Sequence, residues 1–263
     1  MGIGDRLPFE VSRWIVPRLP TSMQRFSLCA SWEDAERASE GYESVPVSGL
    51  DASGPQLPEL SGNGLGVVAA FGVALAYLKD ASKKREAIRV VDFGGADGRY
   101  ADLVSGAFPS MKFDWIVVEM PRVVESVQPR TRRNLVFATD LETVLEGPMD
   151  ISFASAALNY VRRPVHTMNR LLRGSSLTIL ARLPLWPITK HEVAIQRTQR
   201  KPFEISYPTW FFSEELLMRE ITGEAEVVLD FICPEDKAYF AGHYERYRGL
   251  VLANNKYRSA NRK

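Results

Sequence analysis

The 263-residue chain is poor in the residues that build disulfide or metal scaffolds, and it has no excess of charge of either sign. Its two cysteines, Cys29 and Cys233, lie in no Cys-x-x-Cys or Cys/His cluster, so a disulfide framework and a structural zinc site are both excluded. Lys and Arg number 33 against 32 Asp and Glu, and the pI is about 7.8, short of the ~9 typical of nucleic-acid binders. We therefore expect neither a nucleic-acid partner nor a bound metal.

Long hydrophobic runs are also missing. The longest apolar stretch, Leu65–Leu78, is interrupted by two glycines and falls short of the about 20 residues that cross a bilayer. The first residues show no apolar segment behind a basic start, so we expect no secretory leader. With 45% hydrophobic and 25% charged residues, the composition is typical of a globular protein. We expect a cytoplasmic protein without stable membrane insertion, and a homodimer remains open.

The chain divides into a proline-rich segment, 1–64, and a regular part, 65–263. Within the first segment only residues 32–39 have helical character, with Ser31 as N-cap. The segment contains the aromatic residues Trp14, Trp32 and Tyr42, which are a large apolar content for a free tail. We therefore expect it to form a cap that packs on the main domain.

The regular part alternates strands and helices, which predicts an α/β fold. We expect a Rossmann-like, doubly wound and mostly parallel sheet covered by helices on both faces. The predicted parallel strands are 89–93, 113–119, 134–138, 149–154 and 176–181. Two further strands, 226–231 and 247–253, are expected to form a C-terminal antiparallel hairpin with a loop between them. A lid insertion is expected at about 183–222.

A glycine-rich loop follows the first predicted strand. Asp92, Gly94, Ala96 and Gly98 keep the D-x-G-x-G-x-G spacing, with alanine at the usual middle glycine. Such a loop lets the backbone approach a ligand, and the following helix directs N–H groups at it. The loop alone does not separate nicotinamide, flavin and S-adenosylmethionine ligands.

Acidic residues near three consecutive strand ends favour a cationic ligand. Asp92 would repel a diphosphate but attract an ammonium or a sulfonium. Glu119 follows the loop at about the 20-residue distance at which an acid binds ribose hydroxyls, and Asp140 is placed to accept from an adenine amino group. Each acid has a capping alternative, and Asp140 is an equally good N-cap for a helix starting at Leu141. Together they indicate S-adenosylmethionine rather than a dinucleotide.

At this point the sequence resembles a class I S-adenosylmethionine-dependent methyltransferase. More narrowly, it resembles a bacterial methyltransferase family associated with cell-surface polysaccharide or lipopolysaccharide synthesis. The resemblance covers about residues 32–254, and it depends on the segments Trp32-Glu33, Gly41-Tyr42, Val91–Gly98, Trp115–Pro121, Ser155–Tyr160 and Ser206–Ser213.

The resemblance implies that the glycine loop holds the methionine end of the cofactor, Glu119 the ribose and Asp140 the adenine. The expected cofactor contacts are Asp92, Gly94, Gly95, Ala96, Gly98, Glu119, Met120, Asp140, Leu141 and Ser155. The chain departs from the family at Ala181, where an acid usually precedes the arginine that is Arg182 here. If that acid serves the acceptor, its absence bears on activity.

The acceptor is expected beyond the fourth and fifth parallel strands, where ligands bind in open α/β sheets. His191 is the candidate base, with a surface-loop histidine as the alternative, and Tyr160 either lines the pocket or packs at the strand end. Arg182 either holds an anionic acceptor or pairs with a local acid. Tyr207 and Trp210 are expected to face the pocket, whereas Phe211 and Phe212 are expected in the core.

These residues predict methyl transfer to an oxygen, with a nitrogen as the less favoured acceptor atom, of a small molecule such as a saccharide or a polysaccharide precursor. Two alternatives remain open at this stage. One is an NAD-dependent nucleotide-sugar oxidoreductase, and the other is a non-catalytic protein with a methyltransferase fold.

Overall fold

The structure is a computed structural model of the chain. Apart from two isolated positions, it describes residues 25–44, 62–82, 86–200 and 203–256. Most of the predicted cap, including Trp14, therefore lies outside the described residues.

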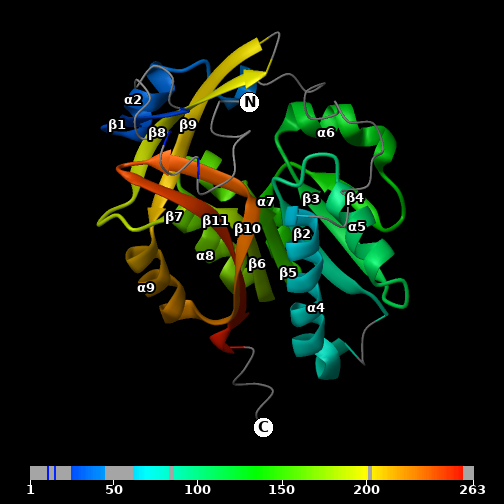
Figure 1. The fold of residues 1–263 in the computed structure, drawn as a ribbon. Helices are drawn as coiled ribbons and strands as arrows, with labels where there is room; N and C mark the ends of the chain where they lie inside the picture. Colours follow the sequence, from blue (N-terminus) through cyan, green and yellow to red (C-terminus); the bar gives the residue numbers. More distant parts are fainter. Residues whose placement is uncertain are drawn as a thin grey trace.

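The main sheet has the predicted doubly wound architecture (Figure 1). Its strands are β2 (Ile88–Phe93), β3 (Phe113–Val118), β4 (Leu135–Ala138), β5 (Met149–Ser155), β6 (Ser175–Leu183), β10 (Ala225–Phe240) and β11 (His243–Asn254). The strand order is β10-β11-β6-β5-β2-β3-β4. The five strands from β6 to β4 run parallel, and β11 is antiparallel to both β6 and β10. The parallel sheet and its antiparallel C-terminal hairpin confirm the predicted fold class.

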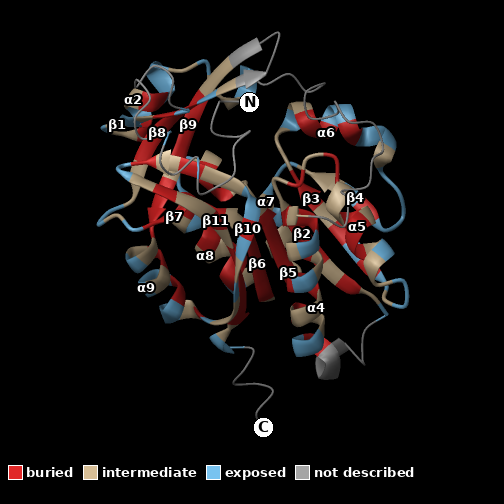
Figure 2. Cartoon of the chain, viewed as in Figure 1, coloured by how far each residue is buried: buried red, intermediate tan, exposed pale blue. Residues whose placement is uncertain are grey.

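Helices cover the two faces of this sheet. They are α4 (Gly62–Ser82), α5 (Arg99–Ala107), α6 (Pro121–Val127), α7 (Leu141–Leu145) and α8 (Pro164–Gly174). One core joins α4 and α5 to strand residues such as Phe153, and the other joins α8 to residues such as Ala154. Because successive strand side chains point to opposite faces, neighbouring residues of β5 enter different cores, and Figure 2 shows the central strands buried. No helix of the described ranges is both long and apolar enough to traverse a bilayer.

The C-terminal hairpin is longer than the sequence predicts. In place of a loop between 231 and 247, the strands continue to a two-residue turn at Ala241 and Gly242, whose φ angles are 49° and 86°. Positive φ at both central residues is typical of the turn that joins twisted antiparallel strands. The residues directly after Cys233 are mostly polar and show no strand pattern, so the sequence does not predict this part of β10. In the structure, its pairing with β11 is interrupted by a register shift between Cys233 and Lys237.

A second sheet combines the N-terminal segment with the insertion after β6. Its strands are β1 (Phe26–Cys29), β7 (Leu185–Trp186), β8 (Glu192–Arg200) and β9 (Phe203–Ser213), in the order β1-β8-β9-β7. One face packs on the far part of the β10–β11 hairpin, where Phe211 stacks on Phe240 at 4.0 Å between ring centroids. The other face is covered by α2 (Trp32–Arg37), which Ser31 caps as predicted. The insertion ends with α9 (Glu214–Glu224), which packs against the main domain.

Candidate active site

The glycine loop turns sharply at the carboxyl end of β2. Gly94 and Gly98 have φ angles of 70° and 73°, and Ala96, at the middle position, is held at 49°. A Cβ on Gly94 would lie 2.5 Å from the Cβ of Ala157, so this position requires glycine. The Gly94 N–H donates to the carbonyl of Val118 at 2.9 Å, which fixes the loop to the end of β3.

Glu119 joins this loop to β3. Its Oε1 accepts from the Ala96 N–H at 3.1 Å, and its Oε2 accepts from the Met120 N–H at 3.0 Å. Burial raises the pKa of the Glu119 carboxyl, against the lowering effect of these two N–H donors. Each carboxylate oxygen accepts more than one hydrogen bond, so Glu119 keeps capacity for a ligand hydroxyl.

Asp92 is buried beneath the same loop with an exposed fraction of 1%. Neither carboxyl oxygen has a hydrogen-bond partner in the described part of the chain. A Cβ on Gly95 would approach Oδ2 to 2.3 Å, so the carboxyl lies directly against the loop backbone. Burial raises the pKa of Asp92 well above its ordinary value, and the nearby Glu119 and Asp97 carboxyls raise it further. The site therefore has a carboxyl group that lacks a positively charged partner.

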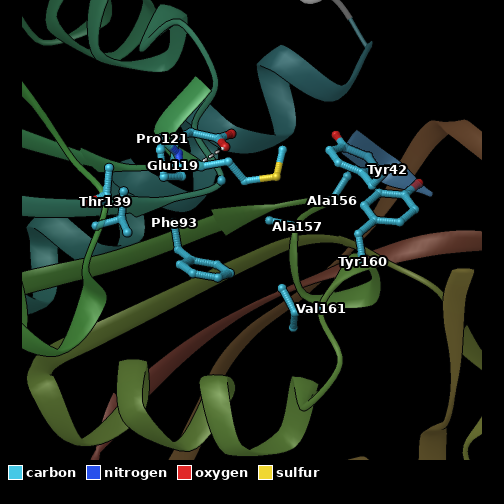
Figure 3. Close-up of a pocket in the computed structure, with 12 residues that line it drawn as sticks. Tyr42, Phe93, Glu119, Pro121, Thr139, Ala156, Ala157, Tyr160 and Val161 are labelled. Carbon is cyan, nitrogen blue, oxygen red and sulfur yellow. Dashed lines mark hydrogen bonds between the residues drawn. The ribbon is translucent and has the colours of Figure 1, made fainter. Parts of the chain in front are cut away.

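A cavity of about 300 Å³ opens next to Glu119 (Figure 3). The ends of β2, β3 and β5 and the segment after β4 contribute to its wall, and Tyr42 of the N-terminal segment closes the other side. Its lining residues are Tyr42, Phe93, Gly94, Val118, Glu119, Met120, Pro121, Thr139, Ala156, Ala157, Tyr160 and Val161. This is the size of a small-ligand site, and it lies beyond the carboxyl ends of the parallel strands.

Two tyrosines, Tyr42 and Tyr160, line the side of the cavity that faces the second sheet, and a third, Tyr207, packs behind them. Tyr42 stacks on Tyr160 at 5.3 Å, and the ring of Tyr207 meets both edge-on at 5.1 and 5.4 Å. The Tyr160 hydroxyl donates to Oε1 of Gln196 at 3.1 Å, and the Gln196 Nε2 donates to the Tyr207 hydroxyl at 3.1 Å. Gln196 is buried in β8, so the insertion holds two of the three rings.

The predicted adenine contact, Asp140, does not line the cavity. Its Oδ1 accepts from the Glu142 N–H at 3.0 Å and its Oδ2 from the Thr143 hydroxyl at 2.6 Å, so Asp140 caps α7. Its neighbour Thr139 lines the cavity instead. Leu141 packs into the core beneath α7, and Ser155 lies at the end of β5, 3.4 Å from the Tyr100 hydroxyl.

Arg182 is paired with an acid, as one of its two predicted roles requires. Its Nε and Nη2 donate to the two carboxyl oxygens of Asp236 at 2.6 and 3.0 Å, and Asp236 also accepts from Asn63. Arg182 takes a φ of 59° at the end of β6. Ala181, where the family usually has an acid, is buried in the core. The acid that pairs with Arg182 is instead Asp236 of β10.

His191 is not brought to the cavity. Its Nδ1 accepts from the Ser213 N–H at 3.0 Å, at the start of α9, and its Nε2 lies 3.9 Å from Glu220. It lies five residues along the chain from Gln196, roughly 16 Å of extended strand. Burial lowers the pKa of His191, which favours the neutral ring that accepts the Ser213 hydrogen bond. The β8–β9 pairing thus places His191 against the start of α9 and outside the cavity lining, and its role as a base stays a prediction.

The aromatic segment of β9 is mostly structural. Trp210 stacks on Trp32 at 5.7 Å, and its Nε1 donates to the Val161 carbonyl at 3.1 Å, so it attaches α2 to the second sheet. Phe211 and Phe212 are buried in the core as expected. Tyr207 is buried behind Tyr160 and is not among the lining residues. Tyr207 and Trp210 therefore pack against neighbouring elements and do not line this cavity, and their contact with a substrate stays a prediction.

Sequence reasoning missed Tyr42 and Gln196 as site residues. In the sequence, Tyr42 stands out as an aromatic residue of the cap and as part of the Gly41-Tyr42 segment of the family resemblance, with no role in the site assigned to it. Gln196 gives no signal, because a polar residue in a predicted insertion is ordinarily exposed. Their roles depend on the contact between the second sheet and the cavity. In the described ranges, no group of three His, Cys, Asp or Glu side chains is arranged to hold a metal ion.

Comparisons with known proteins give similarity of fold alone. No protein-family model and no curated protein matches the chain. Among solved structures, it is similar to the N-terminal domain of EvdMO1, solved with SAH and D-fucose, at 14% identity over 73% of this chain and 83% of that one (TM-score 0.48). It is also similar to the 1,6-didemethyltoxoflavin-N1-methyltransferase of Burkholderia thailandensis, at 14% identity over 71% and 78% (TM-score 0.46). A third similar structure is Streptomyces venezuelae DesVI, at 10% identity over 71% and 91% (TM-score 0.45).

Proposed function

We propose that this protein is an S-adenosylmethionine-dependent methyltransferase that methylates a hydroxyl group of a small molecule. The observation that supports this most directly is the Asp92 carboxyl, buried without a partner beside Glu119 and beneath the glycine loop. A buried carboxylate is stable only with a compensating charge or hydrogen bonds. A ligand with a cationic amino-acid end supplies that charge.

The residues of the cavity suit this cofactor. Glu119 has free lone pairs for ribose hydroxyls while it holds the loop through Ala96 and Met120. The same two acids, Asp92 and Glu119, disfavour a dinucleotide, because its diphosphate would lie next to two carboxyl groups. The oxidoreductase alternative is therefore not adopted.

When bound, S-adenosylmethionine supplies an electrophilic methyl group on a sulfonium. The chain's own part is to hold the acceptor oxygen in line with that methyl and to exclude water. Ala156 and Ala157 leave space at the end of β5, and Tyr42 and Tyr160 enclose the far side. None of the lining residues is a histidine, so we propose that alignment, rather than a histidine base, accounts for most of the catalysis.

We propose a saccharide or polysaccharide precursor as the acceptor, with a neutral reacting part. Aromatic rings such as Tyr42 and Tyr160 provide surfaces on which an apolar sugar face packs. Both carboxyl oxygens of Asp236 already accept hydrogen bonds from Arg182, so we do not assign Arg182 to an anionic acceptor. We propose that the enzyme works in the cytoplasm. We also propose a homodimer, which the oligomeric state in solution tests.

Calorimetric titration of the purified protein with S-adenosylmethionine, S-adenosylhomocysteine and NADH tests this function. We expect the first two to bind and NADH not to bind. Glu119→Gln should weaken the binding of both adenosyl ligands by about tenfold or more, because it removes a charge and places an NH₂ against a loop N–H.

Asp114→Asn is the matched control, since Asp114 is an exposed carboxylate in β3, the strand that precedes Glu119. This variant should bind like the wild type. Binding of NADH without either adenosyl ligand would reject the proposal. Binding of S-adenosylmethionine, with no transfer of a labelled methyl group to any component of a cell-envelope extract, would favour the non-catalytic alternative.

A further inference from the structure

Tyr42 reaches the cavity from outside the main domain. It lies in a short 3-10 helix, Tyr42–Ser44, and the preceding Gly41 N–H donates to the Ser206 carbonyl of β9 at 3.0 Å. On the other side, Arg122 of α6 donates to the Tyr42 carbonyl at 2.9 Å. The backbone of Tyr42 is therefore attached both to the second sheet and to the helix that follows β3.

The Tyr42 ring is held as firmly as its backbone. It stacks on Tyr160 and contacts the edge of Tyr207. Figure 3 shows the Tyr42 hydroxyl directed toward the side of the cavity on which Glu119 lies, whereas the Tyr160 hydroxyl points away. The Tyr160 hydroxyl is committed to Gln196, but the Tyr42 hydroxyl has no hydrogen-bond partner among the described residues.

The charges around the Tyr42 hydroxyl differ from those around Asp92. Two guanidinium groups, Arg122 and Arg182, act on the phenol together with Glu119 and Tyr160. Burial raises the pKa of Tyr42 to about 12, with contributions from Tyr160 and Glu119. The phenol is thus a neutral O–H donor at physiological pH. The Arg122 and Arg182 guanidinium groups act on it, whereas the charges that act on Asp92 are the Glu119 and Asp97 carboxyls.

An α-amino acid end has two charges that need opposite partners. Its ammonium suits Asp92 and the loop, and its carboxylate needs a donor in a less negative part of the cavity. We propose that the Tyr42 hydroxyl binds the α-carboxylate of the methionine end, which makes the N-terminal segment part of the cofactor site. This inference depends on the proposed function, because it assigns a residue to the same ligand.

The test compares ligands that differ only in that carboxylate. Dissociation constants of S-adenosylmethionine and decarboxylated S-adenosylmethionine are measured by calorimetry for the wild type and for Tyr42→Phe. The wild type should prefer the carboxylated ligand by at least about tenfold. Tyr42→Phe should raise the dissociation constant of S-adenosylmethionine about tenfold and leave that of the decarboxylated ligand within about twofold of the wild-type value. The reason is that a hydrogen bond to a charged group is lost only with S-adenosylmethionine.

Tyr77→Phe is the matched control, because it removes an exposed phenol hydroxyl from α4; it should leave both affinities unchanged. The assignment is overturned if Tyr42→Phe weakens the binding of both ligands equally, or if it weakens the binding of neither. A wild type that binds both ligands equally overturns it without any variant. A wild type that binds neither S-adenosylmethionine nor S-adenosylhomocysteine rejects the proposed function itself, which is a distinct result.

Discussion

Asp92, the residue proposed to bind the cationic end of the cofactor, is expected to lower the stability of the ligand-free protein. Its carboxyl is buried without a partner, and burial raises its pKa. A carboxyl whose pKa is higher in the folded state than in the unfolded state stabilises the fold only while it is protonated. That stabilisation is present below the unfolded pKa and is lost as the pH rises through the folded value.

Asp92→Asn should therefore stabilise the ligand-free protein at neutral pH, by about 1–2 kcal/mol, because no charge has to be buried. The stability gain over the wild type should be smallest near pH 4 and should grow as the pH rises. Urea unfolding of both proteins across this range measures it. A gain that is independent of pH would contradict the assigned cause, and calorimetry should show weaker S-adenosylmethionine binding in the variant.

At the level of elements, the second sheet is what joins the N-terminal segment to the insertion. Residues Phe26–Cys29 pair with β8 in antiparallel register, and Trp210 of β9 attaches α2 through Trp32. The far part of the β10–β11 hairpin supports the opposite face. The length of that hairpin therefore decides where the tyrosine side of the cavity lies.

The hairpin turn offers a test of backbone strain separate from the site. Ala241 and Gly242 both have positive φ and are exposed, and asparagine followed by glycine is preferred in such turns. Ala241→Asn should stabilise the protein by about 0.5–1 kcal/mol. Gly242→Ala, where a Cβ would meet nothing within 4 Å, should destabilise it by about 1–2 kcal/mol through backbone strain alone.

Thermal unfolding of the two variants measures these effects. Affinity for S-adenosylmethionine should stay at the wild-type value in both, since the turn does not line the cavity. Melting temperatures that move in the same direction for the two substitutions would contradict the assigned turn geometry.

At the level of the whole molecule, the cavity is bounded by parts that are distant in the sequence. The glycine loop, the end of β3 and Tyr42 meet around one space. A ligand that contacts all of them couples their stabilities, because binding to the folded state adds to the free energy of unfolding.

At a concentration of 100 times its dissociation constant, S-adenosylhomocysteine should add about 2.7 kcal/mol to the free energy of unfolding. For a chain of this size, this corresponds to roughly 5–8 °C in melting temperature. Hydrogen exchange should slow in residues 40–44 as well as in the glycine loop. Protection confined to the loop would mean that the N-terminal segment takes no part in binding.

The sequence predicted the sheet, and the presence of Gly94, Glu119 and Met120 beside one another at strand ends, because both depend on local patterns. Strand–helix alternation, the Asp92–Gly98 spacing and the caps Ser31 and Asp140 are set by residues close together in the chain. Whether Asp140 caps a helix or binds adenine was left open, and the structure shows the cap.

Only the tertiary structure decided the far side of the cavity. The pairing of β1 with β8 and the long β10–β11 hairpin bring Tyr42, Tyr160 and Gln196 together, and they turn His191 toward α9. These contacts join segments that are far apart along the chain, and their free energy comes from packing and buried hydrogen bonds. Such contacts leave no periodic pattern in the sequence, whereas the turn and strand signals of the glycine loop do.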